Sequence, residues 1–125
     1  MPRKRFFLVL LIVWVGLTFL LTSLPNPRLS VNIPYLDKAA HLGVYGVMGL
    51  LCNLWRRESG VSAGRAVLES LLFAAMTGAV DEAHQHWIPG RSMEFLDWMA
   101  DTLGGGTGAV FSLLLPRLFP SLITE

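Results

Sequence analysis

The sequence of 125 residues contains little charge and one cysteine, and both shortages restrict what the protein can be. Charged residues make up 15% of the chain, whereas hydrophobic residues make up 53%. Because Cys52 is alone, no disulfide can form within the chain. The net charge is only +1 and no basic stripe is present, so we expect no nucleic-acid partner. The length predicts a single domain over residues 1–125.

The apolar residues fall into four segments that are long enough to form helices. The mean hydropathy of +0.52 is too high for an ordinary soluble domain and indicates a protein of the lipid bilayer. Residues 6–24 carry no charge, exceed the usual length of a signal-peptide core and precede no A-x-A-like site, so we expect this segment to be retained. The sequence predicts an all-α, integral membrane four-helix bundle, with helices at about 6–24, 39–55, 66–86 and 96–119.

The basic residues are divided unequally between the two ends of these predicted helices. If the N-terminus is cytoplasmic, four crossings return the C-terminus to the cytoplasm. The outer side then holds only Arg28, Lys38 and Arg91. The positive-inside rule favours this multi-pass topology, with both termini cytoplasmic. The cytoplasmic side holds the other seven of the ten basic residues: Arg3, Lys4, Arg5, Arg56, Arg57, Arg65 and Arg117.

The stretch from Asp81 to Asp97 concentrates charge in an otherwise apolar chain. Polar groups between two membrane helices are costly near lipid, so they either stabilise the fold or form a site. On the predicted topology they face outward. The stretch holds four carboxylates, two histidines and one arginine: Asp81, Glu82, Glu94, Asp97, His84, His86 and Arg91.

Helical spacing places small and polar residues in stripes on three of the predicted helices. Small residues let membrane helices approach closely, and Gly104-x-x-x-Gly108 is typical of such contacts. We therefore expect the small residues to pack together and the polar ends to meet in an outward pocket. The stripes are Asp37, His41, Tyr45, Gly46 and Gly49; Ala75, Gly78, Glu82 and Gln85; and Asp97, Asp101, Gly104 and Gly108.

The combined polar pattern resembles the VanZ-like family of bacterial membrane proteins. The resemblance covers residues 37–115, in the order and approximate spacing of that family. Asp101 departs from it, because an asparagine is expected there, and the pocket is correspondingly more acidic. The motifs are Asp37-Lys38-x-x-His41-x-x-x-Tyr45, then Glu82-x-x-Gln85-x-x-x-Pro89-Gly90-Arg91, then Asp97 before a glycine-bearing helix.

This resemblance implies a small multi-helix protein of the bacterial cytoplasmic membrane, in a family whose founding member is associated with low-level teicoplanin resistance. We expect the protein to bind or alter a membrane lipid or lipid-linked cell-wall precursor at the cell envelope. The sequence leaves open whether the protein forms a homo-oligomer. The predicted ligand-binding residues are Asp37, Lys38, His41, Tyr45, Glu82, Gln85, Arg91, Asp97 and Asp101.

The same residues allow more than one chemistry. Arg91 suits bidentate binding of a phosphate or carboxylate, but it could equally pair with Glu82 or Asp97. Glu82 and Asp97 are the catalytic candidates of the alternative function, a lipid- or precursor-modifying transferase or hydrolase. A structural role as ion-pair partners is favoured over that role. The sequence leaves open whether the protein is an enzyme.

Metal binding and a cofactor are not expected from the sequence. Glu82 and His86 are four residues apart, a spacing that suits chelation on one helix face. However, neither H-x-x-x-H nor H-E-x-x-H is present, and His84 and His86 point in different directions on a helix. We therefore predict no metal site.

Overall fold

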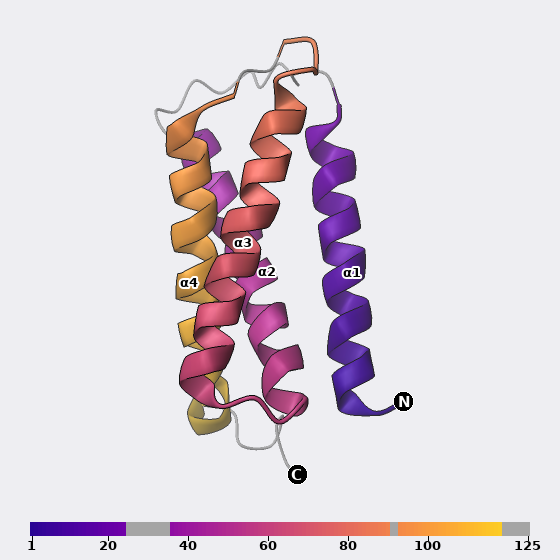
Figure 1. The fold of residues 1–125 in the computed structure, drawn as a ribbon, viewed down its shortest axis with the longest axis vertical. Coiled ribbons are helices and arrows are strands. Elements are labelled where there is room, and N and C mark those ends of the chain that lie inside the picture. Colours follow the sequence, from indigo (N-terminus) through magenta and orange to yellow (C-terminus); the bar gives the residue numbers. More distant parts are fainter. Residues whose placement is uncertain (25–35, 91–92, 119–125) are drawn as a thin grey trace.

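The computed structural model describes residues 1–24, 36–90 and 93–118, and these residues form four α-helices and no strand (Figure 1). The helices alternate in direction, so the starts of α2 and α4 lie at the same end of the bundle as the finishes of α1 and α3. The predicted all-α fold with four helices is confirmed. Their bounds are α1 Arg3–Thr22, α2 Leu36–Glu58, α3 Ala63–Gln85 and α4 Phe95–Leu118.

Helices α2 and α4 make the most extensive contact in the bundle, and glycines allow it. A methyl group added to Gly108 would collide with the carbonyl of Gly46, and one added to Gly49 would collide with the carbonyl of Gly105. The two backbones therefore touch where any larger residue would hold them apart. The predicted close approach at the glycine stripes is confirmed.

The turn between α2 and α3 also depends on a glycine. Gly60 adopts a φ of 90°, in the left-handed region that favours a residue without a Cβ. The N–H of Val61 donates to the carbonyl of Arg56, and the N–H of Gly60 donates to the carbonyl of Arg57. This pair of hydrogen bonds is the Schellman motif, which ends α2 and turns the chain into α3.

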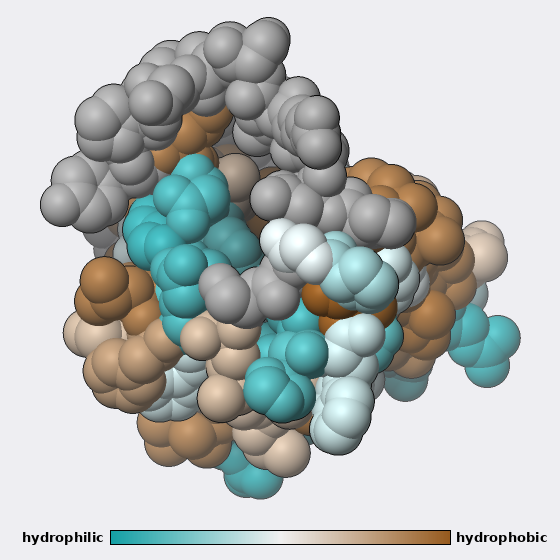
Figure 2. Space-filling model, turned by 90° about the horizontal axis from the view of Figure 1, so that it is seen from above, coloured by the Kyte–Doolittle hydropathy of each residue, from teal (hydrophilic) through white to brown (hydrophobic). Residues whose placement is uncertain are grey.

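The interior of the bundle combines an apolar core, which includes Met48 and Cys52, with an unusually large number of buried polar side chains, and the sides of the bundle are largely apolar. Large apolar side chains on α1, α3 and α4 are exposed, including Ile12, Met76 and Leu103. Seen from the end where α2 and α4 begin, hydrophilic residues gather near the middle and hydrophobic residues lie on the flanks (Figure 2). Buried polar side chains include Asn53, Ser70, Asp81, Glu82, Gln85, Asp97, Asp101 and Ser112.

Helix α1 is the most apolar helix and packs mainly against α2. Leu11 is buried in that contact, and the indole Nε1 of Trp14 donates a 2.9 Å hydrogen bond to the carbonyl of Val44. Among the described residues, α1 and α3 are the helices long and apolar enough to cross a membrane, by length and composition.

Candidate functional site

Five side chains meet at the end of the bundle where α2 and α4 begin, and we call them the polar cluster. Their acidic members lie in the packed interior: Asp101 is fully buried, and Glu82 and Asp97 are nearly so. Asp37 lies beside the cluster but is exposed. The cluster consists of Lys38 and His41 from α2, Glu82 from α3, and Asp97 and Asp101 from α4.

Lys38 neutralises carboxylates from α2, from α4 and from the chain that precedes α4. Its Nζ lies 2.9 Å from Oδ1 of Asp97 and 2.6 Å from Oδ2 of Asp37, and it also contacts Oε2 of Glu94. Three carboxylates around one ammonium leave this part of the site acidic. The predicted structural role of Asp97 as an ion-pair partner of Lys38 therefore has direct support in the geometry.

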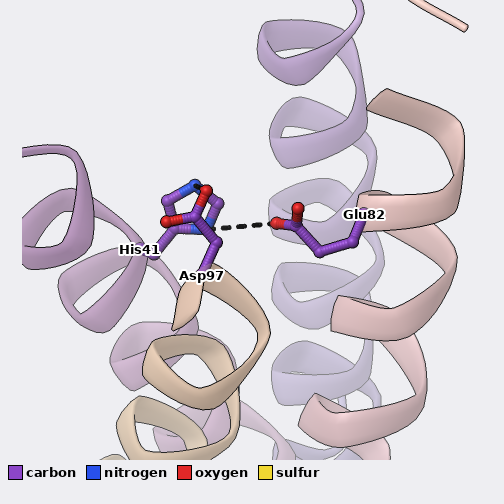
Figure 3. A group of neighbouring side chains, drawn as sticks. All are labelled: His41, Glu82 and Asp97. Carbon is purple, nitrogen blue, oxygen red and sulfur yellow. Dashed lines mark ion pairs between the residues drawn. The ribbon is translucent and has the colours of Figure 1, made fainter. Parts of the chain in front are cut away.

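His41 stands at the centre of the cluster and is held by one close hydrogen bond. Its Nδ1 lies 2.7 Å from Oδ1 of Asp101. An ionised carboxylate only accepts hydrogen bonds, so Nδ1 is the donor in this contact, and in the neutral ring Nε2 carries no proton. Nε2 faces Oδ2 of Asp97 at 3.8 Å, and Nδ1 lies 3.9 Å from Oε1 of Glu82 (Figure 3).

Glu82 reaches across from α3 toward His41 (Figure 3). Its residue surface is 3% exposed, and Oε2 accepts a 3.2 Å hydrogen bond from the backbone N–H of Glu94. Oε1 has no hydrogen-bond partner among the residues that the structure describes. A buried oxygen without a donor is uncommon in folded proteins, so this atom needs an explanation.

The close packing of α3 against α4 depends on Gly78. A Cβ added there would lie 2.9 Å from both Cβ and Oδ2 of Asp101. Glycine at this position lets the carboxylate of α4 lie directly against the backbone of α3. The packing of α3 against α4 at Gly78 therefore fixes the position from which Asp101 bonds His41.

A second polar group lies beside the cluster and connects α1, α2 and α3. The hydroxyl of Tyr45 donates to Oδ2 of Asp81 at 3.3 Å, and Oγ1 of Thr22 donates to Oδ1 of the same carboxylate at 2.6 Å. Tyr45, a predicted site residue, thus bonds across helices one turn below His41. Gln85 is also buried, and its Nε2 has no hydrogen-bond partner among the described residues.

Arg91 is the one predicted site residue that lies outside the described part of the chain. Its expected contact with an anion, with Glu82 or with Asp97 stays a prediction. The other predicted residues lie at one end of the bundle, with Lys38, His41, Glu82, Asp97 and Asp101 in direct proximity.

Two residues that contribute to this end were not among the predicted ligand-binding residues. Asp81 is fully buried, and Glu94 contacts both Lys38 and Glu82. Asp81 follows Gly78 by three residues and precedes Gln85 by four, so it shares their helix face, and that spacing was the available signal. Glu94 precedes α4, where helical spacing gives no signal.

An apolar cleft of about 540 Å³ opens beside the cluster, between α3 and the start of α4. Glu82 lies at its polar edge, while Phe95 and Met93 contribute largely exposed apolar surface. The cleft therefore joins a buried carboxylate to an apolar surface. Its lining consists of Ala79, Glu82, Met93, Glu94, Phe95 and Trp98.

Two groups of donor atoms in the described residues are close enough to share one ion. In the first, one ligand atom each of His41, Glu82 and Asp97 lie within 4.8 Å of one another. The second group has the same spacing and consists of Asp37, Glu94 and Asp97. Lys38 already lies among the carboxylates of the second group, so that group is an ion-pair network.

Comparison with known proteins gives one match. No curated protein and no solved structure matches the chain. The model of the VanZ/LLP1 family matches residues 7–116, which include most of α1 as well as nearly all of the three helices that carry the polar motifs. Because this match spans most of the sequence, the chain belongs to the VanZ/LLP1 family.

Proposed function

We propose that the protein spans the bacterial cytoplasmic membrane four times, with both termini cytoplasmic and the polar cluster facing outward. The apolar flanks of the bundle support this, because exposed side chains such as Ile12 and Leu103 suit contact with lipid. The basic residues Arg56, Arg57 and Arg65 lie at the opposite end from the cluster, where the positive-inside rule puts them in the cytoplasm.

The proposed function is to bind or alter an amphiphilic envelope component, either a membrane lipid or a lipid-linked cell-wall precursor. The observation that carries it is the cleft beside Glu82. A hydrocarbon chain fits against Phe95, Met93 and Trp98, while a polar head group reaches the side chains around Glu82 and Lys38. An amphiphile is the class of ligand that matches both surfaces.

At the cell envelope, such binding would change how the precursor is displayed to lipophilic glycopeptides. The test compares teicoplanin and vancomycin susceptibility of a glycopeptide-sensitive Gram-positive host that expresses wild type or Ala79→Trp. Ala79 lines the cleft, so an indole there would fill it. Val80→Trp is the matched control, because Val80 is 59% exposed and does not line the cleft.

We expect wild type and Val80→Trp to raise the teicoplanin concentration needed for inhibition, with little effect on vancomycin, and Ala79→Trp to lose that rise. All three proteins must be present in the membrane fraction in equal amounts. Equal protection by Ala79→Trp and Val80→Trp would separate the function from the cleft. The absence of any rise with well-inserted wild type would contradict the glycopeptide role.

The alternative function is a lipid- or precursor-modifying transferase or hydrolase, with Glu82 and Asp97 transferring protons. The buried Oε1 of Glu82 and the His41–Asp101 hydrogen bond favour it, because both resemble arrangements that hold a general base in place. Mass spectrometry of envelope lipids separates the two functions. A new species that requires wild type and disappears with Glu82→Gln would support the enzyme. Teicoplanin protection without any new species would support binding alone.

A further inference from the structure

We propose that His41, Glu82 and Asp97 form a binding site for one divalent transition-metal ion, of which Zn²⁺ is the probe. The sequence predicted no metal, because the pairing it offered was Glu82 with His86 on one helix. The structure instead brings together residues from three helices, a combination that no local spacing reveals. This inference stands independently of the proposed ligand and of the membrane topology.

The first observation is the geometry of the donor atoms. One nitrogen of His41 and one carboxylate oxygen each of Glu82 and Asp97 lie within 4.8 Å of one another. Zinc bonds of about 2.0–2.2 Å to such ligands correspond to ligand–ligand distances of roughly 3.3–3.5 Å in a tetrahedron. The distance of 3.8 Å between Nε2 of His41 and Oδ2 of Asp97 is only slightly longer. Oε1 of Glu82 lies 3.9 Å from Nδ1 of His41, so its carboxylate must shift toward Nε2 to complete the coordination.

The second observation is independent of the acidity of the cluster. Glu82 is 3% exposed, and its Oε1 has no hydrogen-bond donor among the described residues. The side chain points from α3 toward His41 (Figure 3). Burying a polar oxygen without a partner is costly, and a bound cation would supply the missing partner.

The environment of His41 is the one that histidine ligands commonly have. A metal-bound histidine usually donates its other ring N–H to a carboxylate, which fixes the orientation of the ring. Nδ1 of His41 makes this contact with Oδ1 of Asp101 at 2.7 Å, and Nε2 is left facing Asp97. Asp101 is therefore a positioning residue for the proposed site.

Lys38 is compatible with a cation in this place. Its Nζ contacts Oδ1 of Asp97, while Oδ2 of the same carboxylate faces His41. The two oxygens of Asp97 thus serve two partners on different sides. One imidazole with two carboxylates is a donor set suited to first-row divalent ions, and it lacks the thiolates of structural zinc sites.

The experiment measures Zn²⁺ binding to the full chain, purified in mild detergent with a tag that contains no histidine. The protein is stripped with EDTA, dialysed and titrated with Zn²⁺ in a calorimeter, without added lipid. We expect about one ion per chain, as for a mononuclear site. His41→Ala and Glu82→Gln should abolish this binding, and Asp101→Asn should weaken it about 10- to 100-fold, as loss of a ligand-orienting carboxylate does.

The matched control is His86→Ala, because His86 is exposed and lies outside the three-residue site. It should bind Zn²⁺ as wild type does. Circular dichroism and gel filtration establish that each variant keeps the helical fold. Absence of binding by wild type, or equal binding by His41→Ala and wild type, would overturn the proposal.

X-ray absorption of the Zn²⁺-loaded wild type gives an answer that does not depend on any variant. We expect a nitrogen and oxygen shell with one imidazole. A sulfur ligand, which Cys52 alone could supply as a thiolate, would overturn the site. Because no lipid is present, failure here leaves the amphiphile proposal untouched, and failure of the susceptibility test leaves this one untouched.

Discussion

Both ends of the bundle contain basic residues paired with carboxylates, but the two ends differ in how deeply these side chains are buried. At the end where α2 finishes and α3 begins, Arg56 and Arg65 pair with Glu69 at 2.6 Å and 3.0 Å, and the side chain of Arg65 is 71% exposed. At the other end, the side chains of Glu82 and Asp101 are 4% and 0% exposed. Water screens the first set and is excluded from most of the second.

The two ends therefore differ in how their charged residues affect stability. Exposed ion pairs contribute little to stability, because water and side-chain entropy offset their attraction. Buried carboxylates lose their hydration, and each one must recover that loss from a partner. Lys38 pairs with Asp97, and His41 bonds Oδ1 of Asp101. In contrast, Oε1 of Glu82 and Oδ2 of Asp101 have no hydrogen-bond partner among the described residues, and Oε1 of Glu82 faces His41 only at 3.9 Å. This incomplete compensation is what motivates the proposed ligand.

The largest expected effect comes from separating α2 from α4 beneath the polar cluster. In Gly108→Ala, the new methyl would collide with the carbonyl of Gly46, so the two helices must move apart. Overpacking of this kind costs about 2–3 kcal/mol. The free energy of unfolding, measured by titrating micelles with a denaturing detergent, should fall by that amount.

The control for this change is Gly43→Ala, on the same helix as Gly46 but with open space around it. Alanine is the better helix former, so the control should be unchanged or more stable by about 0.5–1 kcal/mol. Equal losses in the two variants would show that the α2–α4 contact is looser than the glycine packing implies.

A smaller effect is expected from removing one carboxylate within the cluster. Asp101→Ala leaves Nδ1 of His41 buried without its acceptor, which costs about 2 kcal/mol of unfolding free energy. Asp101→Asn keeps an acceptor oxygen and should recover more than half of that loss. Both are measured with EDTA present, so that bound metal does not contribute. If the two variants were equally unstable, the hydrogen bond to His41 would not be the source of the loss.

The sequence predicted the number of helices correctly, but the helix it predicted for α2 is shorter than the observed one at both ends. The apolar pattern predicts a helix at about 39–55, whereas α2 runs from Leu36 to Glu58. Hydropathy marks where apolar side chains stop, but backbone hydrogen bonding continues through polar residues such as Lys38 and Arg57. The extra turn at the start is the one that carries Lys38 into the cluster.

Helical spacing predicted which face of each helix carries polar residues, but it gave no means of pairing those faces. The stripe with His41 and the stripe with Asp101 were both visible, and their 2.7 Å contact follows from the packing of α2 on α4. The contacts of α1 had no sequence signal, because Trp14 and Thr22 lie in an uncharged, largely apolar segment whose few hydroxyl side chains do not indicate a partner helix. The bonds from Thr22 to Asp81 and from Trp14 to Val44 depend on tertiary structure only.

The smallest effect is expected at the exposed end, where Arg65→Ala tests the other half of the comparison. Arg65 and Glu69 are one helical turn apart and form an ion pair, but Glu69 keeps Arg56 as a second partner. Loss of Arg65 therefore leaves no charge buried and unpaired. We expect no measurable change in the free energy of unfolding, in the same detergent titration as for Asp101→Ala. A loss as large as that of Asp101→Ala would mean that the ion pairs of this end also fix the bundle, and that burial is not what distinguishes the polar cluster.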